Sequence, residues 1–246
     1  MKRFEHKVVI VTGATSGIGA GTAMAFAAEG ASVVLVGRNM ERGEKIKQEI
    51  INQGGDAVFI FCDVSNAPQV QQMITTVIQK YAKIDVLFNN AGIMLQSVEI
   101  ERMSLEDWQK TIDINLTGTF LVSKYAKPYI IKTKGTIINN ASIAGLQHYC
   151  AGRSYAYSAS KAAVIQFTHQ MAKNYGEEGI RVNCICPGIV DTPILGNRDR
   201  HLYAQRVPLK RLATPADIAN VVLFLASEQS SYLTGVVLPI DGGVCL

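Results

Sequence analysis

A short apolar run followed at once by a glycine-rich turn constrains the fold of this chain more than any other feature. Residues 8–11 are valine and isoleucine only, as expected of a strand buried on both faces. The turn at residues 12–19 has the spacing G-x-x-x-G-x-G, and a helical pattern continues over residues 20–29. Glycines allow a tight turn close to a phosphate, and a helix N-terminus attracts anions. This order predicts a phosphate cradle for a nucleotide, with a tight turn that binds nothing as the alternative.

Strand-like and helix-like segments alternate through all 246 residues. The patterns predict strands at residues 7–11, 32–36, 57–61, 86–88, 136–140, 181–185 and 236–239. They predict helices at residues 20–29, 41–53, 68–81, 104–132, 157–175 and 215–226. We therefore expect an α/β fold, a doubly wound Rossmann-type parallel sheet of about seven strands with helices on both faces, in a single domain over residues 1–246.

One connection is longer and more polar than such a fold needs. Residues 194–207 are weakly patterned and contain Arg198, Arg200, His201 and Arg206. Long connections in compact domains are often functional. We expect a lid or substrate loop over about residues 191–207. Its arginines fit an anionic substrate or, at least as well, solvated surface charges.

Composition excludes several classes of protein. A hydrophobic content of 48% supports a large core, and the net charge of +4 comes without a long Lys/Arg run, so we expect no nucleic-acid partner. No apolar stretch is long enough to span a membrane, and we expect a cytoplasmic protein. The odd, irregularly spaced cysteines predict buried reduced thiols and no metal site; they are Cys62, Cys150, Cys184, Cys186 and Cys245.

The end of the second strand bears on which dinucleotide the chain binds. An acid there would bind the ribose hydroxyls of NAD, whereas an arginine neutralises the 2′-phosphate of NADP. The chain has Gly37 and Arg38, and no acid before Glu41, which favours NADP over NAD. Arg38 as a mere solvent-exposed flank of the next helix is the alternative. Asp63, after the third strand, would either bind the adenine amino group or cap the helix from about residue 68.

Tyr157 and Lys161 are four residues apart on an expected helix and so share one face. A positive charge nearby favours the phenolate and lowers the pKa of a tyrosine, which makes it a usable proton donor or acceptor. Asn115 lies among apolar residues in the middle of another expected helix. A buried amide must be hydrogen-bonded, so Asn115 marks either a kink or a polar relay.

Taken in order, these motifs resemble those of the short-chain dehydrogenase/reductase family, in its main single-domain branch. The resemblance covers essentially the whole chain. It is carried by the motifs Thr12-Gly-x-x-x-Gly17-Ile18-Gly19, Asp63, Asn89-Asn90-Ala91-Gly92, Asn115, Ser142, Tyr157-x-x-x-Lys161 and Pro187-Gly188.

The resemblance implies a role for each catalytic residue. Tyr157 would be the general acid/base, and Ser142 would hydrogen-bond the same substrate oxygen. Lys161 would lower the pKa of Tyr157 and hold the nicotinamide ribose, and Asn115 would keep a water beside Lys161. The implied cofactor-binding residues are Gly13, Thr15, Ser16, Gly17, Ile18, Gly19, Arg38, Asp63, Val64, Asn89, Ala91, Gly92, Tyr157, Lys161, Pro187, Gly188, Val190 and Thr192.

One spacing departs from the family pattern. Fifteen positions separate Ser142 from Tyr157, where many relatives have thirteen. Tyr155 stands at thirteen, but Ala159 rather than lysine follows it four residues on, so the role goes to Tyr157. The longer segment, residues 146–153, should reshape one wall of the substrate pocket, and its His148 is more readily a polar contact than a second acid/base.

The expected function is an NADP(H)-dependent oxidoreductase that interconverts a ketone and a secondary alcohol. The resemblance leaves three small-molecule substrate classes open: 3-oxoacyl thioesters, hydroxysteroids or bile acids, and sugars or polyols. It also implies a homotetramer or homodimer. The alternatives are an NAD-preferring dehydrogenase of the same family and a non-catalytic nucleotide-binding sensor or scaffold.

Overall fold

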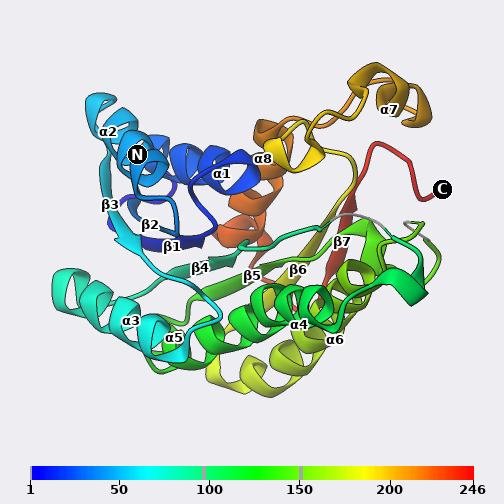
Figure 1. The fold of residues 1–246 in the computed structure, drawn as a ribbon. Helices are drawn as coiled ribbons and strands as arrows, with labels where there is room; N and C mark the ends of the chain where they lie inside the picture. The colour runs from blue at the N-terminus through cyan, green and yellow to red at the C-terminus, as the bar shows by residue number, and fades with distance from the viewer. Residues whose placement is uncertain (1, 96–97, 150–151) are drawn as a thin grey trace.

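Seven parallel strands form one sheet in the order β3-β2-β1-β4-β5-β6-β7 (Figure 1). The structure, a computed structural model, describes residues 2–95, 98–149 and 152–246. The strands are β1 (Val8–Thr12), β2 (Ser32–Gly37), β3 (Asp56–Phe61), β4 (Val86–Asn89), β5 (Thr136–Asn140), β6 (Arg181–Pro187) and β7 (Val237–Ile240). The predicted doubly wound α/β fold is confirmed, because each strand pairs in parallel with its neighbours.

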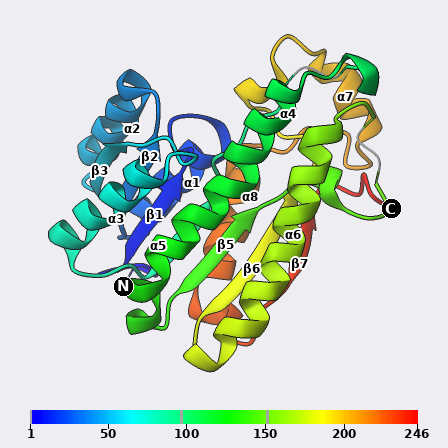
Figure 2. The same ribbon diagram turned by 60° about the horizontal axis from the view of Figure 1, so that its bottom comes forward.

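Helices cover both faces of the sheet (Figures 1 and 2). The helices are α1 (Gly17–Ala28), α2 (Met40–Asn52), α3 (Ala67–Tyr81), α4 (Leu105–Ile112), α5 (Gly118–Thr133), α6 (Tyr155–Tyr175), α7 (Arg200–Arg206) and α8 (Pro215–Ala226). Apolar side chains of α1, α2 and α8 pack on one face of the sheet, and those of α3, α5 and α6 pack on the other. None of the helices described is long and apolar enough to cross a membrane.

Three elements differ from the sequence-based expectations. The helix expected over residues 104–132 is interrupted by a π-helical turn, Asp113–Thr117, between α4 and α5. Helix α6 begins at Tyr155 rather than at Tyr157. The segment expected to be a loop over residues 194–207 contains the short helix α7, whose N-terminus is capped by Asp199 through hydrogen bonds from His201 N and Leu202 N.

The cysteines bear out the expectation of buried reduced thiols only in part. Cys62, Cys184 and Cys186 are buried free thiols, whereas the free thiol of Cys245 is half-exposed. Cys150 lies outside the described residues. No group of His, Cys, Asp and Glu suited to a metal ion occurs among residues 2–95, 98–149 and 152–246.

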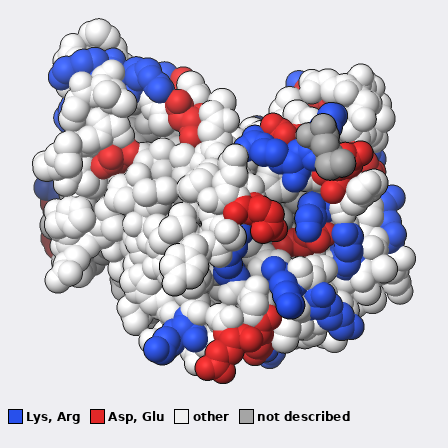
Figure 3. Space-filling view, turned by 180° about the vertical axis from the view of Figure 1, so that it is seen from behind, with Lys and Arg blue, Asp and Glu red and all other residues white. Residues whose placement is uncertain are grey.

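The surface has one broad area without charged side chains. Figure 3 shows it on the side turned away from the viewer in Figure 1, with Lys, Arg, Asp and Glu gathered mainly beyond its borders. Several large apolar side chains near the C-terminal end of the chain are exposed: Phe224, Tyr232 and Leu246. Uncharged areas of this kind are typical of interaction surfaces.

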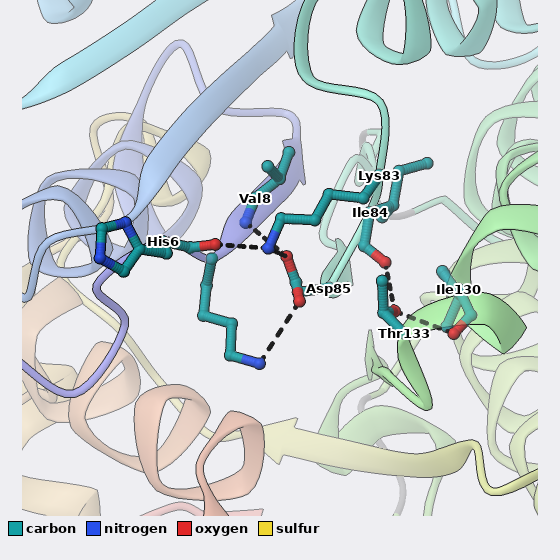
Figure 4. A network of polar contacts seen from close by, with 8 residues as sticks. His6, Val8, Lys83, Ile84, Asp85, Ile130 and Thr133 are labelled. Carbon is teal, nitrogen blue, oxygen red and sulfur yellow. Dashed lines mark hydrogen bonds and ion pairs between the residues drawn. The ribbon is translucent and has the colours of Figure 1, made fainter.

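The amino ends of the strands are held together by the buried carboxylate of Asp85 (Figure 4). It accepts a hydrogen bond from the backbone N–H of Val8 at 2.8 Å and forms ion pairs with Lys7 at 3.4 Å and Lys83 at 3.1 Å. Lys83 also donates to the carbonyl of His6. These contacts connect the start of β1 with the start of β4, two strands that are distant in sequence and adjacent in the sheet.

We expect Asp85→Ala to lower the free energy of unfolding by about 2 kcal/mol, because it leaves the buried N–H of Val8 without its acceptor. The change lies at the opposite end of the sheet from the candidate site, so activity per folded molecule should be unchanged. Urea unfolding checks the first expectation and a turnover assay the second. An unchanged unfolding midpoint would show that the Asp85 contacts do not stabilise the fold.

Candidate active site

A cleft of about 890 Å³ opens at the carboxyl ends of the strands. It lies where β1 is flanked by β2 on one side and β4 on the other, the place where the direction of strand order reverses. Ligands of open α/β sheets bind at such a switch point. Most of the predicted cofactor residues line the cleft: Gly13, Thr15, Ser16, Gly17, Ile18, Arg38, Asp63, Val64, Ala91, Gly92, Tyr157, Lys161, Pro187, Gly188, Val190 and Thr192.

The glycine-rich turn leaves room for a ligand that side chains would otherwise fill. Gly13 has a φ of +64°, and a Cβ there would lie 2.8 Å from the Cα of Ala91. A Cβ on Gly19 would lie 2.3 Å from the carbonyl oxygen of Gly13, so Gly19 allows α1 to start directly under the turn. Gly19 itself does not line the cleft. The turn therefore fits a diphosphate at the N-terminus of α1.

The end of β4 presents Asn90 to the cleft rather than the predicted Asn89. The amide of Asn89 points into the interior, where it donates to Ser123 Oγ and Asn139 Oδ1 at 2.9 Å each. Asn90 lines the cleft and donates to the carbonyl of Thr12 at 2.9 Å. Successive side chains of a strand point to opposite faces, so the two asparagines cannot both reach the cleft. The structure does not bring Asn89 to the site.

Arg38 and Asp63 form an ion pair at the adenosine end of the cleft, with 3.2 Å between guanidinium and carboxylate. Burial raises the pKa of Asp63, but hydrogen bonds from Ser65 and the charge of Arg38 outweigh it, so the pKa lies below its usual value. Arg38 remains half-exposed and faces the cleft rim. The two predicted adenosine-binding residues are thus brought together.

The alternative in which Asp63 caps the helix is wrong. The N-cap of α3 is Asn66, whose side chain accepts a hydrogen bond from the N–H of Gln69. Asp63 instead accepts hydrogen bonds from the backbone N–H and the hydroxyl of Ser65. The cap needs a side chain directly before the first helical residue, and Asp63 stands too far upstream.

Ser142 and Tyr157 meet in the cleft although fifteen positions separate them. Ser142 lies two residues after the end of β5, and its hydroxyl accepts a hydrogen bond from Ala144 N at 3.1 Å. The turn Ile143–Gly145 that follows packs closely against α6. A Cβ on Gly145 would come within 2.6 Å of the backbone of Lys161, so only glycine fits there. Tyr155, the alternative tyrosine, does not line the cleft. The placement supports the choice of Tyr157.

The pKa of Tyr157 is raised in this structure. Burial raises it, and the hydrogen bond with Ser142 opposes that shift without cancelling it. A neutral phenol at physiological pH is the form that donates a proton to a developing alkoxide. The expected lowering of this pKa by Lys161 stays a prediction.

Lys161 is almost fully buried, at 3% exposure, yet carries a charge. Its Nζ donates to the carbonyl of Asn140 at 2.7 Å and lies 5.7 Å from the ring centroid of Tyr157. Burial lowers the pKa of Lys161 from 10.5 to about 8. The side chain is therefore mostly protonated at pH 7 and close to the phenol, as a lysine that tunes Tyr157 must be.

Asn115 lies in the π-helical turn, fully buried, and does not line the cleft itself. Its Oδ1 accepts from Ile93 N at 2.8 Å, and its Nδ2 donates to Ile93 O and to Ser160 Oγ at 3.0 Å each. A Cβ on Gly92 would lie 3.3 Å from both Asn115 Oδ1 and Lys161 Nζ. The structure thus confirms a distorted helix at Asn115 and places it close to Lys161. A role as a water-holding relay stays a prediction.

The loop after β6 closes the cleft opposite the glycine-rich turn. Val190 and Thr192 are buried and line it, and Val190 pairs with Ala213 in an isolated parallel bridge. A Cβ on Gly17 would lie 3.1 Å from Thr192 Cγ2. Thr192, which the resemblance implies in cofactor binding, therefore lies directly across from the glycine-rich turn.

The far end of the cleft is formed by residues that the motifs do not include. Tyr149, Tyr203 and Arg206 line the cleft there, together with apolar side chains such as Leu95 and Leu195. His148 is exposed and does not line the cleft, which removes it as a second acid/base. Cys150 and Ala151, in the segment 146–153 that was expected to shape the substrate pocket, lie outside the described residues.

Sequence reasoning missed three residues that hold the site together. Thr12 Oγ1 accepts hydrogen bonds from Asn90 N and Ala91 N at 2.9 and 3.0 Å. Asn140 donates to Asn90 Oδ1 at 2.8 Å, while its carbonyl holds Lys161. These bonds connect the glycine-rich turn with Lys161 across the ends of β1, β4 and β5. Two consecutive asparagines at the end of a strand, Asn139 and Asn140, were the available signal.

Comparison with known proteins identifies the family. A family model described as enoyl-(acyl carrier protein) reductase matches residues 13–245. The chain belongs to the short-chain dehydrogenase/reductase family, as its motifs predicted, and is an oxidoreductase. Members of this family use NAD or NADP.

Individual relatives resemble the chain over nearly its full length. It is 40% identical to a 3-oxoacyl-(acyl-carrier-protein) reductase FabG of Thermotoga maritima, covering 99% of this chain and 100% of that protein. It is 38% identical to a meso-2,3-butanediol dehydrogenase of Serratia marcescens, covering 98% and 95%. The crystal structure of a levodione reductase superposes with a TM-score of 0.94 at 33% identity, covering 99% of each chain.

Proposed function

We propose that the protein is an NADP(H)-dependent oxidoreductase that interconverts a ketone and a secondary alcohol, with Tyr157 as general acid/base. The observation that carries the proposal is the meeting of Tyr157, Ser142 and Lys161 in the same cleft as the glycine-rich turn. Titratable groups with shifted pKa values gathered in a cleft are typical of catalytic sites. All the residues that the chemistry requires are present in the chain.

Each residue has a distinct task in the reduction. When bound, the dinucleotide supplies the hydride. Tyr157 donates its phenolic proton to the substrate oxygen as negative charge develops there, and Ser142 donates a hydrogen bond to the same oxygen. The charge of Lys161 stabilises the phenolate that remains. In the oxidative direction, the same phenolate removes the proton from the alcohol.

Proton exchange with solvent would run past Lys161. Its Nζ is close to Asn115, whose amide is fixed by three hydrogen bonds. We propose that Asn115 orients a water beside Lys161, so that Tyr157 regains its proton after each turnover. The residue holds the water through its position in the π-helical turn, a distortion that often occurs at functional sites.

Two observations support a preference for NADP over NAD. A Cβ on Gly37 would lie 2.6 Å from Thr15 Cγ2, so the position at which an acid would bind the ribose cannot hold a side chain without displacing Thr15. Arg38 lies next to it at the rim of the cleft, half-exposed. The guanidinium of Arg38 has several N–H donors, so it can bind a 2′-phosphate while it keeps its ion pair with Asp63.

We expect Arg38→Ala to weaken NADPH binding by about tenfold to a hundredfold, the value of one charged hydrogen-bonded contact, while NADH binding changes less than threefold. Fluorescence titration with each nucleotide measures both dissociation constants. Arg42, an exposed arginine on α2 that is not part of the cleft lining, provides the control variant Arg42→Ala. Equal effects on the two nucleotides would contradict the 2′-phosphate assignment.

The substrate class stays open between 3-oxoacyl thioesters, hydroxysteroids or bile acids, and sugars or polyols. Relatives named for acyl-carrier-protein, hydroxysteroid and butanediol substrates support the first, second and third class in turn. A panel with one ketone of each class and NADPH tests the proposal, with a 2-enoyl thioester as control. Oxidation of NADPH by at least one ketone and not by the enoyl thioester is expected. Binding of NADPH without turnover of any panel member would favour the sensor or scaffold alternative.

We further propose that the protein forms a homotetramer or homodimer. The support is the uncharged area of Figure 3 and the exposed apolar side chains near the C-terminal end of the chain. Strand β7 is also an edge of the sheet among the strands described, with partly exposed side chains. Light scattering of the purified protein would show a mass of two or four chains; a monomer would contradict this part of the proposal.

A further inference from the structure

The short helix α7 brings an arginine to the far end of the cleft. Arg206 lies over the ring of Tyr203, with 5.4 Å between its guanidinium carbon and the ring centroid. Both residues line the cleft, and Tyr149 lines it from the segment that follows Ser142. Burial, with Cys245, Tyr203 and Asp241, raises the pKa of Tyr149, and the positive charge of Arg206 opposes this shift, so both the guanidinium and the carboxylate of Asp241 are near the phenol.

Arg206 forms no ion pair with any carboxylate of residues 2–95, 98–149 and 152–246. The remaining residues, Met1, Gln96, Ser97, Cys150 and Ala151, carry no acidic side chain. By contrast, Arg38 of the cleft lining pairs with Asp63, and on the same helix Arg200 pairs with Asp191 at 2.7 Å. Arg206 is therefore a cation of the cleft lining that has no ion-pair partner in the part of the chain that the structure describes.

The charge balance of the cleft strengthens this observation. Four cations line it: Arg38, Lys161, Arg198 and Arg206. Asp63 is the one acidic residue in that lining, and it pairs with Arg38 at the adenosine end. The far end is thus positive, and its other lining residues are largely apolar.

The bound dinucleotide does not account for Arg206. Arg198 donates to the carbonyl of Ile194, in the turn after Thr192, and so stands on the side of the phosphate cradle. Arg206 stands instead with Tyr203 of α7 and with Tyr149, which lies in the chain segment between Ser142 and Tyr157. This is the region in which the substrate must lie if its oxygen meets Tyr157 and Ser142.

We infer that Arg206, stacked on Tyr203 beside Tyr149, binds an anionic oxygen group of the substrate, a carboxylate or a phosphate. The inference rests on the proposed function and narrows its substrate to ketones that carry such a group. A guanidinium presents paired donors that match both groups, and the aromatic ring holds it in place. Binding of this group would seat the ketone with its carbonyl toward Tyr157.

The test compares two matched pairs of ketones, each with a charged and an uncharged member. The first pair is a 3-oxoacyl coenzyme A thioester and the N-acetylcysteamine thioester of the same acyl group. The second is a 3-oxo acid and its methyl ester. In the wild type the charged member of at least one pair should have the lower KM. Arg206→Gln should raise that KM about tenfold, with little change in kcat and none in the KM of the uncharged member.

Arg200→Gln is the matched control, because Arg200 lies on the same helix, pairs with Asp191 and is not part of the cleft lining. It should leave every KM unchanged. The dissociation constant of NADPH should be the same in Arg206→Gln and the wild type.

The outcomes distinguish a failure of the inference about Arg206 from a failure of the proposed function. An effect confined to the coenzyme A pair identifies a phosphate, and an effect on the acid pair identifies a carboxylate. Turnover of all four ketones with no KM change in Arg206→Gln would overturn the inference and leave the proposed function standing, as would a matching loss in Arg200→Gln or in NADPH affinity. No turnover by the wild type of these four ketones or of any ketone of the substrate panel would count against the proposed function itself, whereas turnover confined to uncharged ketones of the panel would overturn the inference alone.

Discussion

Tyr157→Phe should lower kcat by about 10²–10⁴-fold, the usual contribution of a positioned general acid/base. Phenylalanine keeps the ring in its packing between Ser142 and Lys161 but has no proton to give to the substrate oxygen. The cleft otherwise keeps its shape, so the dissociation constant of NADPH should change less than about threefold. Steady-state kinetics and a nucleotide titration on the same preparation measure the two effects.

Tyr155→Phe is a matched control for this variant. Tyr155 stands at the spacing that many relatives use, lies two residues away on α6 and does not line the cleft. It should keep nearly full activity. The opposite pattern, with Tyr155→Phe inactive and Tyr157→Phe active, would show that the catalytic tyrosine follows the spacing from Ser142 and not the position of Lys161.

Lys161→Met should abolish turnover to a similar extent while making the protein more stable. Burial lowers the pKa of Lys161 from 10.5 to about 8. Each pKa unit corresponds to about 1.4 kcal/mol, so the buried charge destabilises the folded state by about 3 kcal/mol at pH 7. Methionine removes this cost but also loses the hydrogen bond to Asn140, worth about 1 kcal/mol. We expect a net gain of about 1–2 kcal/mol in the free energy of unfolding.

The sign of the pH dependence follows from the same shift. Below about pH 8 Lys161 is charged in both the folded and unfolded states, and the full cost of burial is present. Between about 8 and 10.5 only the unfolded state stays protonated, so the wild type gains stability as the pH rises and the advantage of Lys161→Met shrinks. Urea unfolding of both proteins at pH 7 and pH 9.5 measures this. A variant less stable than the wild type at pH 7 would contradict the assignment of Lys161 as a buried cation.

The layered fold could be predicted because its signals are local. Residues 8–11 and 182–186 are nearly all apolar, and only a strand covered on both faces accommodates such runs. The predicted helix boundaries were less accurate, because the first residue of a helix depends on which nearby side chain accepts hydrogen bonds from the free N–H groups of its first turn. Asn66 rather than Asp63 begins α3, and the π-helical turn at Asn115 depends on hydrogen bonds to Ile93 and Ser160, which are distant in sequence.

Candidate catalytic residues could be proposed from sequence because the chemistry allows few substitutes, and the structure brings Ser142, Tyr157 and Lys161 into one cleft; their roles stay a prediction. The cofactor residue Asn89 was misplaced because side-chain alternation depends on where the strand ends, and β4 continues one residue further than expected, to Asn89. The polar bridge through Asn140 could not be predicted, since it forms only when β4 and β5 become neighbours.

The far end of the cleft was the least predictable part. The residues around Arg206 were expected to be a loop, because seven residues of α7 show too short a pattern to indicate a helix. In the folded chain Arg206 lines the cleft, whereas Arg200 pairs with Asp191. The positions of the two arginines in the sequence do not reveal this difference. The sequence therefore indicated anionic substrates only as one of two equal alternatives.

The most direct test of the proposed function is a titration of the wild-type protein with NADPH and with NADH, followed by the fluorescence of the bound nicotinamide. We expect tight binding of NADPH and binding of NADH weaker by at least about tenfold, because the proposed site offers Arg38 to a 2′-phosphate and has Gly37 where an acid would bind the ribose. Preference for NADH would overturn the cofactor assignment and favour an oxidative role. Binding of neither nucleotide would contradict the assignment of the glycine-rich turn as a phosphate cradle and, with it, the proposed function.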